Sequence, residues 1–148
     1  MKKDELKQLA LKFREAIQIT VREREYFCKN DRLQYFPCGG CDDSAEMFAY
    51  YLLEKFGIHA VQVNGVLTDE NGYRQNHQWV RMPSKLIVDL TVDQFEYFLK
   101  KSVKVYVGDE GDFYTEFTEK VEVDNSMISL KNERLLHDYR MICRHLEG

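Results

Sequence analysis

The stretch 58–91 constrains the fold most, because two turn signals divide it into three short apolar segments. The first segment, IHAVQVNGVL, is followed by Asp69-Glu70-Asn71-Gly72, a run typical of hairpin turns. The second, NHQWVRM (76–82), ends at Pro83–Ser84, and the third, KLIVDLT, occupies 85–91. We predict three strands joined by turns, which gives an antiparallel meander.

Helical periodicity precedes and follows this meander. Apolar residues recur every three or four positions in 4–27 and in 41–56, and Gly57 is placed to end the second helix. The aperiodic segment 28–40 predicts a loop between them. A last amphipathic helix is expected over 135–146, because its apolar residues follow the same spacing.

The segment between the meander and the last helix has a less regular pattern. We expect a short helix and then a fourth strand in 93–107, a turn at 109–112, and more strand in 113–130. No repeat or linker divides the chain. We therefore expect one domain over residues 1–148, of the α+β class, with N-terminal helices packed on an antiparallel sheet and a C-terminal helix.

Charge and composition exclude several functional classes. The 21 basic and 25 acidic residues give a net charge of -4, the wrong sign for a general phosphate-backbone binder, so we expect no nucleic-acid partner. No apolar run approaches the ~20 residues of a membrane span, and no secretory signal is visible. We therefore predict a cytoplasmic protein with free thiols and no membrane partner. Delivery as an effector and the oligomeric state stay open.

Cys41 stands at a position that suits a nucleophile. It occupies the first turn of the expected helix 41–56, where free backbone N–H groups and the helix dipole favour a thiolate and a nearby oxyanion. The preceding Gly39–Gly40 pair lets the backbone approach a substrate closely. Asp42 and Asp43 follow directly, and their charges oppose a thiolate unless both side chains point to solvent. A buried, inert cysteine is the alternative.

His77 and Asp89 could supply the base and its orienting group. Asp89 interrupts the apolar run LIVDL, so a buried carboxylate there needs a partner, and His77 is the nearest titratable candidate. The two side chains share one face of the sheet only if the connection at Pro83–Ser84 has an odd number of residues or a bulge. Solvent exposure of His77, or capping of backbone N–H groups by Asp89, are the structural alternatives.

Together these residues resemble a transglutaminase-like domain of the papain-like superfamily of Cys-His-Asp/Asn hydrolases and acyltransferases. The matching runs are Cys41-Asp42-Asp43-Ser44-Ala45, Asn76-His77-Gln78-Trp79-Val80 and Val88-Asp89-Leu90-Thr91. The resemblance covers about 35–95, the expected catalytic core. It implies a papain-like fold with Cys41 as nucleophile, His77 as general base and acid, and Asp89 orienting His77.

The resemblance also implies an oxyanion site and a class of substrate. One donor would be the backbone N–H of Cys41, and the side-chain candidates are Gln34, Asn76 and Gln78. Trp79 is expected to pack against the helix that begins at Cys41 rather than to contact substrate. The implied function is hydrolysis or acyl transfer at an amide bond of a peptide or protein, without cofactor or metal.

Two other functional classes remain open at this point. The pair Cys38–Cys41 could be a redox site, or could bind zinc with two further ligands from Cys28, His59, His77 or Cys143. A transglutaminase-like fold could also be a catalytically silent binding module.

Overall fold

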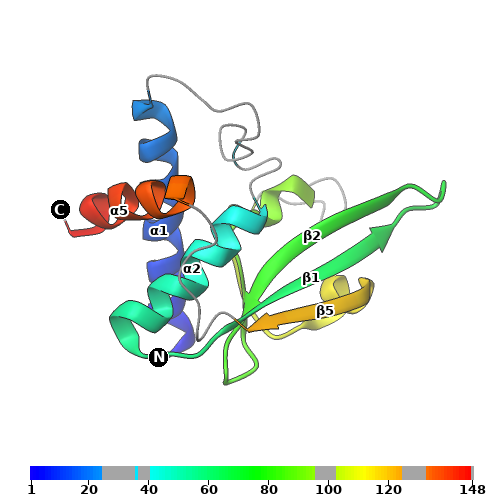
Figure 1. The fold of residues 1–148 in the computed structure, drawn as a ribbon. Coiled ribbons are helices and arrows are strands. Elements are labelled where there is room, and N and C mark those ends of the chain that lie inside the picture. Colours follow the sequence, from blue (N-terminus) through cyan, green and yellow to red (C-terminus); the bar gives the residue numbers. More distant parts are fainter. Residues whose placement is uncertain (25–35, 37–40, 96–102, 125–132, 148) are drawn as a thin grey trace.

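The computed structural model describes residues 1–24, 36, 41–95, 103–124 and 133–147. Two helices precede the first three strands, and the last helix ends the described chain (Figure 1). The bounds of the elements are α1 Lys3–Glu23, α2 Cys41–Phe56, β1 Val61–Thr68, β2 Arg74–Arg81, β3 Ile87–Asp89, η2 Val92–Phe95, β4 Tyr106–Gly108, α4 Gly111–Thr115, β5 Thr118–Asp124 and α5 Glu133–Glu147.

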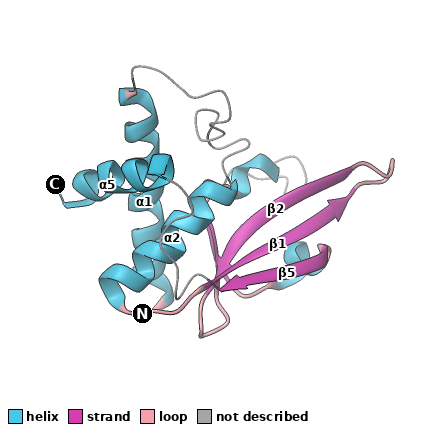
Figure 2. Ribbon diagram, viewed as in Figure 1, coloured by secondary structure: helices cyan, strands magenta, loops and turns pink. Residues whose placement is uncertain are grey.

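The five strands form one antiparallel sheet in the order β4-β3-β2-β1-β5. Figure 2 shows β2, β1 and β5 side by side. The predicted meander is the centre of the sheet, β1-β2-β3. Asp69 closes the first hairpin, since its Oδ1 accepts the backbone N–H groups of Asn71 at 2.8 Å and Tyr73 at 2.9 Å. Gly72 takes the left-handed conformation, with φ 81°, that this turn requires.

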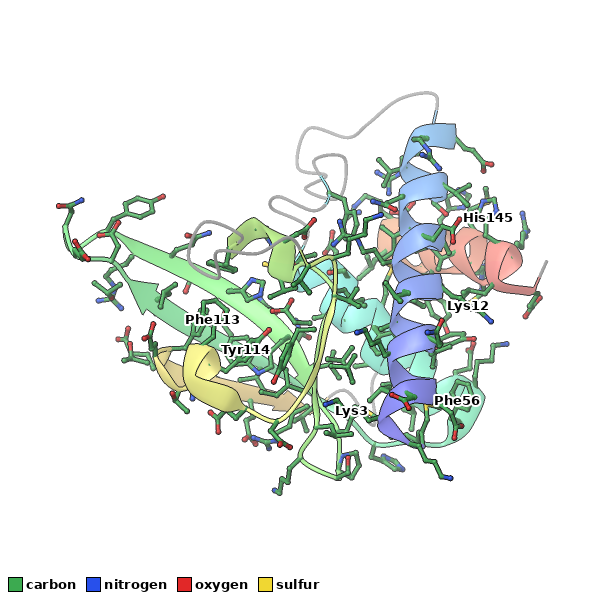
Figure 3. The ribbon with its side chains drawn as sticks, turned by 180° about the vertical axis from the view of Figure 1, so that it is seen from behind. Lys3, Lys12, Phe56, Phe113, Tyr114 and His145 are labelled. Atoms are coloured by element: carbon green, nitrogen blue, oxygen red, sulfur yellow. The ribbon has the colours of Figure 1, made fainter. Side chains whose placement is uncertain are left out.

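The sheet separates two apolar clusters. On one face, α1, α2 and α5 cover side chains such as Val80 and Val88, and this cluster is the larger. On the opposite face, α4 and the strands enclose an aromatic cluster that contains Trp79, Tyr114 and Phe117. Figure 3 labels Tyr114 on α4, against the strands. The predicted α+β arrangement of helices on an antiparallel sheet is confirmed.

Element by element, most predictions agree with the structure, and one is wrong. Helix α2 has the predicted bounds 41–56, and Gly57 follows it with φ 64°. The sequence reading of 113–130 as strand fails at its start, because Gly111–Thr115 is a short helix and β5 begins only at Thr118. Parts of the predicted elements at 25–27, 96–102 and 125–130 lie outside the described residues. Among the helices in the described ranges, none has the length and apolarity needed to cross a membrane.

Candidate active site

His77 lies in a stretch of β2 that has a strand neighbour on only one side among the described residues. Gly65 of β1 pairs with it, whereas the pairing between β2 and β3 involves only Val80 and Arg81. The ring of Phe95 in η2 packs edge-on against the imidazole at 4.7 Å between centroids. His77 is 0% exposed, so the alternative of a solvent-exposed strand-end histidine is wrong.

The loop between β2 and β3 has the odd length that a shared face requires. Met82 and Leu86 are joined by a backbone hydrogen bond of 2.8 Å, which leaves the three residues 83–85 as the loop. Lys85 adopts φ 78°, the left-handed conformation common at the last position of three-residue hairpin loops. The register therefore puts His77 and Asp89 on the same face of the sheet.

Asp89 has the partner that its burial demanded. Its Oδ2 accepts a hydrogen bond from Nε2 of His77 at 2.7 Å and a second from the hydroxyl of Tyr114 at 2.8 Å. Its Oδ1 accepts the backbone N–H of Thr91 at 3.0 Å. Asp89 is 0% exposed. The carboxylate thus both orients a histidine and caps the backbone after β3, so the two alternatives raised from the sequence hold together.

The charge balance at His77 favours its protonated form. Burial alone lowers the pKa of His77, because an apolar surrounding disfavours the imidazolium. The adjacent charge and hydrogen bond of Asp89, with a smaller contribution from Cys41, outweigh burial and raise the pKa of His77 to about 9.

Cys41 opens α2 near His77. The thiol is half-buried and free, and it makes a minor contribution to the raised pKa of His77. Since Nε2 of His77 is occupied by Asp89, Nδ1 is the nitrogen left for the thiol. This atom is buried and makes no hydrogen bond with the described part of the chain. The structure therefore brings the three predicted residues together as thiol, imidazole and carboxylate.

Aromatic rings enclose the imidazole on its other sides. Trp79 and Phe117 each lie 6.0 Å from it between ring centroids, in addition to Phe95. The expectation that Trp79 packs against the helix beginning at Cys41 is wrong. Trp79 points to the opposite face of the sheet, where it contacts Phe117 and Tyr114. Strand alternation explains this, because Trp79 shares the face of His77 while Val80 faces the helices.

A thiolate at Cys41 was expected only if Asp42 and Asp43 both point to solvent, and the structure does not meet this condition. Asp43 is 3% exposed and pairs with Arg134 of α5 at 3.1 Å. The guanidinium offsets the negative charge of Asp43 close to Cys41. The objection that these carboxylates oppose a thiolate is therefore met for Asp43 by an ion pair rather than by solvent.

The predicted oxyanion residues are differently placed. The side chain of Gln78 is half-buried and accepts a hydrogen bond from Gln62, whose amide also donates to the backbone carbonyl of Asp42 at 3.4 Å. This chain of contacts ties Gln78 to the first turn of α2. Asn76 is exposed, and Gln34 lies outside the described residues.

Arg14 is a buried charge that the sequence analysis did not single out. It forms a bidentate pair with Asp93 at 2.7 and 2.9 Å and donates to the backbone carbonyls of Leu90 and Lys104, both at 2.8 Å. These bonds attach α1 to the segment that directly follows Asp89. Its sequence position offered a signal, since Arg14 stands four residues after Ala10 on the apolar stripe of α1.

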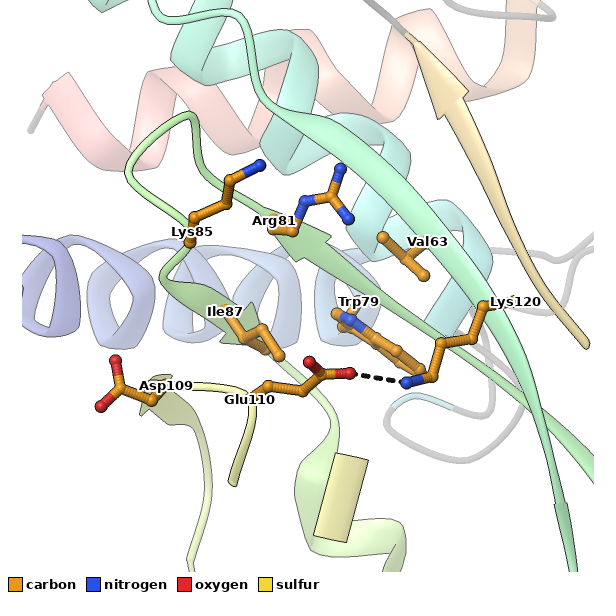
Figure 4. Close-up of a pocket in the computed structure, with 8 residues that line it drawn as sticks. All are labelled: Val63, Trp79, Arg81, Lys85, Ile87, Asp109, Glu110 and Lys120. Carbon is orange, nitrogen blue, oxygen red and sulfur yellow. Dashed lines mark hydrogen bonds and ion pairs between the residues drawn. The ribbon is translucent and has the colours of Figure 1, made fainter. Parts of the chain in front are cut away.

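A pocket of about 400 Å³ lies on the aromatic face, beyond Trp79. Figure 4 shows Trp79 and Ile87 within it and the ion pair of Lys120 with Glu110, 2.6 Å long, across it. Cys41 and His77 are not among the residues that line this pocket.

The zinc and redox alternatives involve residues that the structure leaves out. Within the described ranges, no group of three His, Cys, Asp or Glu side chains is arranged to hold a metal ion. Cys38, on which both alternatives depend, and Cys28, one of the candidate zinc ligands, lie outside those ranges. Comparisons with protein-family models, with curated proteins and with solved structures found no match to this chain.

Proposed function

We propose that this chain is a cysteine hydrolase or acyltransferase that acts on an amide bond of a peptide or protein substrate, in the cytoplasm. One observation carries the proposal. A fully buried histidine bonds a buried carboxylate through one ring nitrogen, and its other nitrogen remains for a half-buried thiol at a helix N-terminus. A nucleophile, a base and a group that orients the base are what acyl transfer through a covalent intermediate requires.

The proposed reaction begins at the thiol. The proton of Cys41 passes to Nδ1 of His77 before attack, which forms a thiolate–imidazolium pair in keeping with the raised pKa of His77, and Sγ then attacks the carbonyl carbon of the amide. The backbone N–H of Cys41, at the start of α2, is a donor for the oxyanion that forms. His77 then gives its proton to the leaving nitrogen as the C–N bond breaks, which leaves a thioester on Cys41.

The thioester is resolved by a second nucleophile. Water or an amine loses a proton to His77 and attacks the thioester carbon, and the thiol is restored when His77 returns that proton to the sulfur. Throughout, Asp89 keeps Nε2 of His77 protonated, so Nδ1 is the atom that exchanges protons. The raised pKa of His77 suits the step in which the imidazolium donates to a leaving amine.

We also infer that the fold belongs to the transglutaminase-like group. Three features support this: a cysteine opens a helix, the histidine follows on a strand packed beneath that helix, and the aspartate ends the next strand. The order and spacing of the motifs in the sequence point the same way.

A generic acyl donor tests the proposed chemistry without knowledge of the substrate. With 4-nitrophenyl acetate, we expect one acetyl group on Cys41, detected by peptide mass spectrometry, together with release of 4-nitrophenolate. His77→Gln should slow the acetylation of Cys41 at least ~100-fold, the scale of a lost general base. Cys143, half-buried in α5, serves as the reference thiol in the same sample. Equal acetylation of Cys41 and Cys143, unaffected by His77→Gln, would favour a catalytically silent binding module instead.

A further inference from the structure

We propose that Tyr114 is a positioning residue of this site, which holds Asp89 in place and limits how strongly the carboxylate attracts the proton of His77. The inference rests on the proposed function, because it assigns a residue to the same triad. It gives a role to the C-terminal third of the chain, where the sequence contains no recognisable motif.

The first observation is the set of hydrogen bonds at Asp89. Oδ2 is shared by two donors, Nε2 of His77 at 2.7 Å and the hydroxyl of Tyr114 at 2.8 Å, and Oδ1 takes the N–H of Thr91 at 3.0 Å. Donors on both oxygens leave the carboxylate a single orientation. Without the hydroxyl of Tyr114, Oδ2 of Asp89 would keep only one of its two donors and would be held less firmly.

The second observation is the burial of the tyrosine hydroxyl. Tyr114 is 2% exposed, and its ring contacts Trp79, Tyr106 and Phe113 with centroids 5.1 to 5.2 Å away. Phenylalanine would fill this aromatic cluster equally well, so packing alone does not explain a buried hydroxyl. A buried tyrosine hydroxyl needs a partner, and here the partner is the oxygen that also holds His77.

The third observation is that Tyr114 stays a donor at every working pH. Burial, followed by the charge of Asp89, raises the pKa of Tyr114 far above its usual value. The phenol therefore keeps its proton throughout the pH range in which His77 titrates. A fixed donor of this kind is what a positioning role requires.

The consequence for His77 follows from charge sharing. A hydrogen bond from Tyr114 disperses part of the negative charge of Asp89, so that less of it stabilises the imidazolium. Removing the hydroxyl should raise the pKa of His77 still further. His77 would then release its proton to a leaving group less readily.

The test compares two tyrosines of the same cluster. Tyr114→Phe removes the hydroxyl bonded to Asp89, whereas Tyr106→Phe removes one that donates to the backbone carbonyl of Asp109. We expect the pKa of His77, followed by NMR of carbon-13-labelled histidine, to rise by about one unit in Tyr114→Phe, the scale of a hydrogen bond to a charged group. Tyr106→Phe should leave it unchanged.

A second measurement leaves every tyrosine hydroxyl in place. Biosynthetic replacement of tyrosine by 3-fluorotyrosine makes each phenol a stronger donor, so the pKa of His77 should fall. A purely structural role for Tyr114 would change the stability of the protein and leave the His77 titration where it is. Unchanged titration in Tyr114→Phe and in the fluorinated protein would overturn the inference.

The same titration separates this inference from the proposed function. An ordinary pKa for His77 in the wild-type protein, with no acetylation of Cys41, would remove the proposed function itself. A raised wild-type pKa with normal acetylation, unaffected by the hydroxyl of Tyr114, would remove only the role of that tyrosine.

Discussion

Raising the pH from about 6 to about 10 should destabilise this protein through one buried side chain, His77. In the folded state, Asp89 and Cys41 hold the pKa of His77 at about 9 despite its burial, compared with its ordinary value of 6.5. The protonated form is therefore favoured by folding. Its contribution is complete below the unfolded pKa and is lost progressively as the pH rises to the folded pKa.

The size of the effect follows from the shift. Between 6.5 and about 9, each pH unit removes about 1.4 kcal/mol, which amounts to about 3 kcal/mol in total. Above about 9 the contribution of His77 is exhausted and the curve levels off. Solvent screening does not reduce this contribution, because His77 is 0% exposed.

Urea unfolding across this range measures the free energy of unfolding directly. His77→Gln provides the reference, because it keeps a polar side chain beside Asp89 and cannot titrate. Subtracting the free energy of unfolding of His77→Gln from that of the wild type removes the contribution of the other titrating groups. We expect this difference to fall by about 3 kcal/mol over the window. A difference that stays flat between pH 6.5 and 9, or that rises, would refute the reasoning from charge and burial.

Two further substitutions test the surroundings of the site. Arg14→Leu leaves the half-buried carboxylate of Asp93 without its cation and should lower the free energy of unfolding by about 3 kcal/mol, whereas exposed Arg22→Leu should change it by less than ~0.5 kcal/mol in the same urea titration. Gly65→Ala would bring a Cβ within 2.9 Å of Trp79, and we expect a loss of about 1–3 kcal/mol by thermal unfolding. An unchanged melting temperature in Gly65→Ala would contradict the close packing behind His77.

Local patterns in the sequence accounted for the centre of the fold. The apolar period of 41–56 and the glycine after it predicted α2 to the residue, and the turn signals predicted the meander. Both depend on neighbours along the chain. The short helix at Gly111–Thr115 does not depend on neighbours along the chain. Its aromatic residues are typical of strands, and their burial against β1 and β2 decides that the segment is helical.

In the candidate site too, local sequence features could be predicted, whereas contacts between residues distant along the chain could not. The types and order of Cys41, His77 and Asp89 were visible, and the parity of one loop was identified as the condition for their meeting. The sequence could not show that Lys85 would take the left-handed conformation that gives this loop three residues. Nor could it show that Tyr114, 25 residues after Asp89, bonds its carboxylate, because only the folded sheet brings them together.

The pH dependence of thiol alkylation tests the central claim most directly, that Cys41 and His77 act as one unit. Iodoacetamide labelling, quantified for each cysteine by peptide mass spectrometry, compares Cys41 with Cys143, whose pKa is raised by burial. We predict that Cys41 is labelled faster than Cys143, and that His77→Gln abolishes this advantage. Identical pH profiles for the two cysteines, or a Cys41 profile unchanged in His77→Gln, would contradict the account.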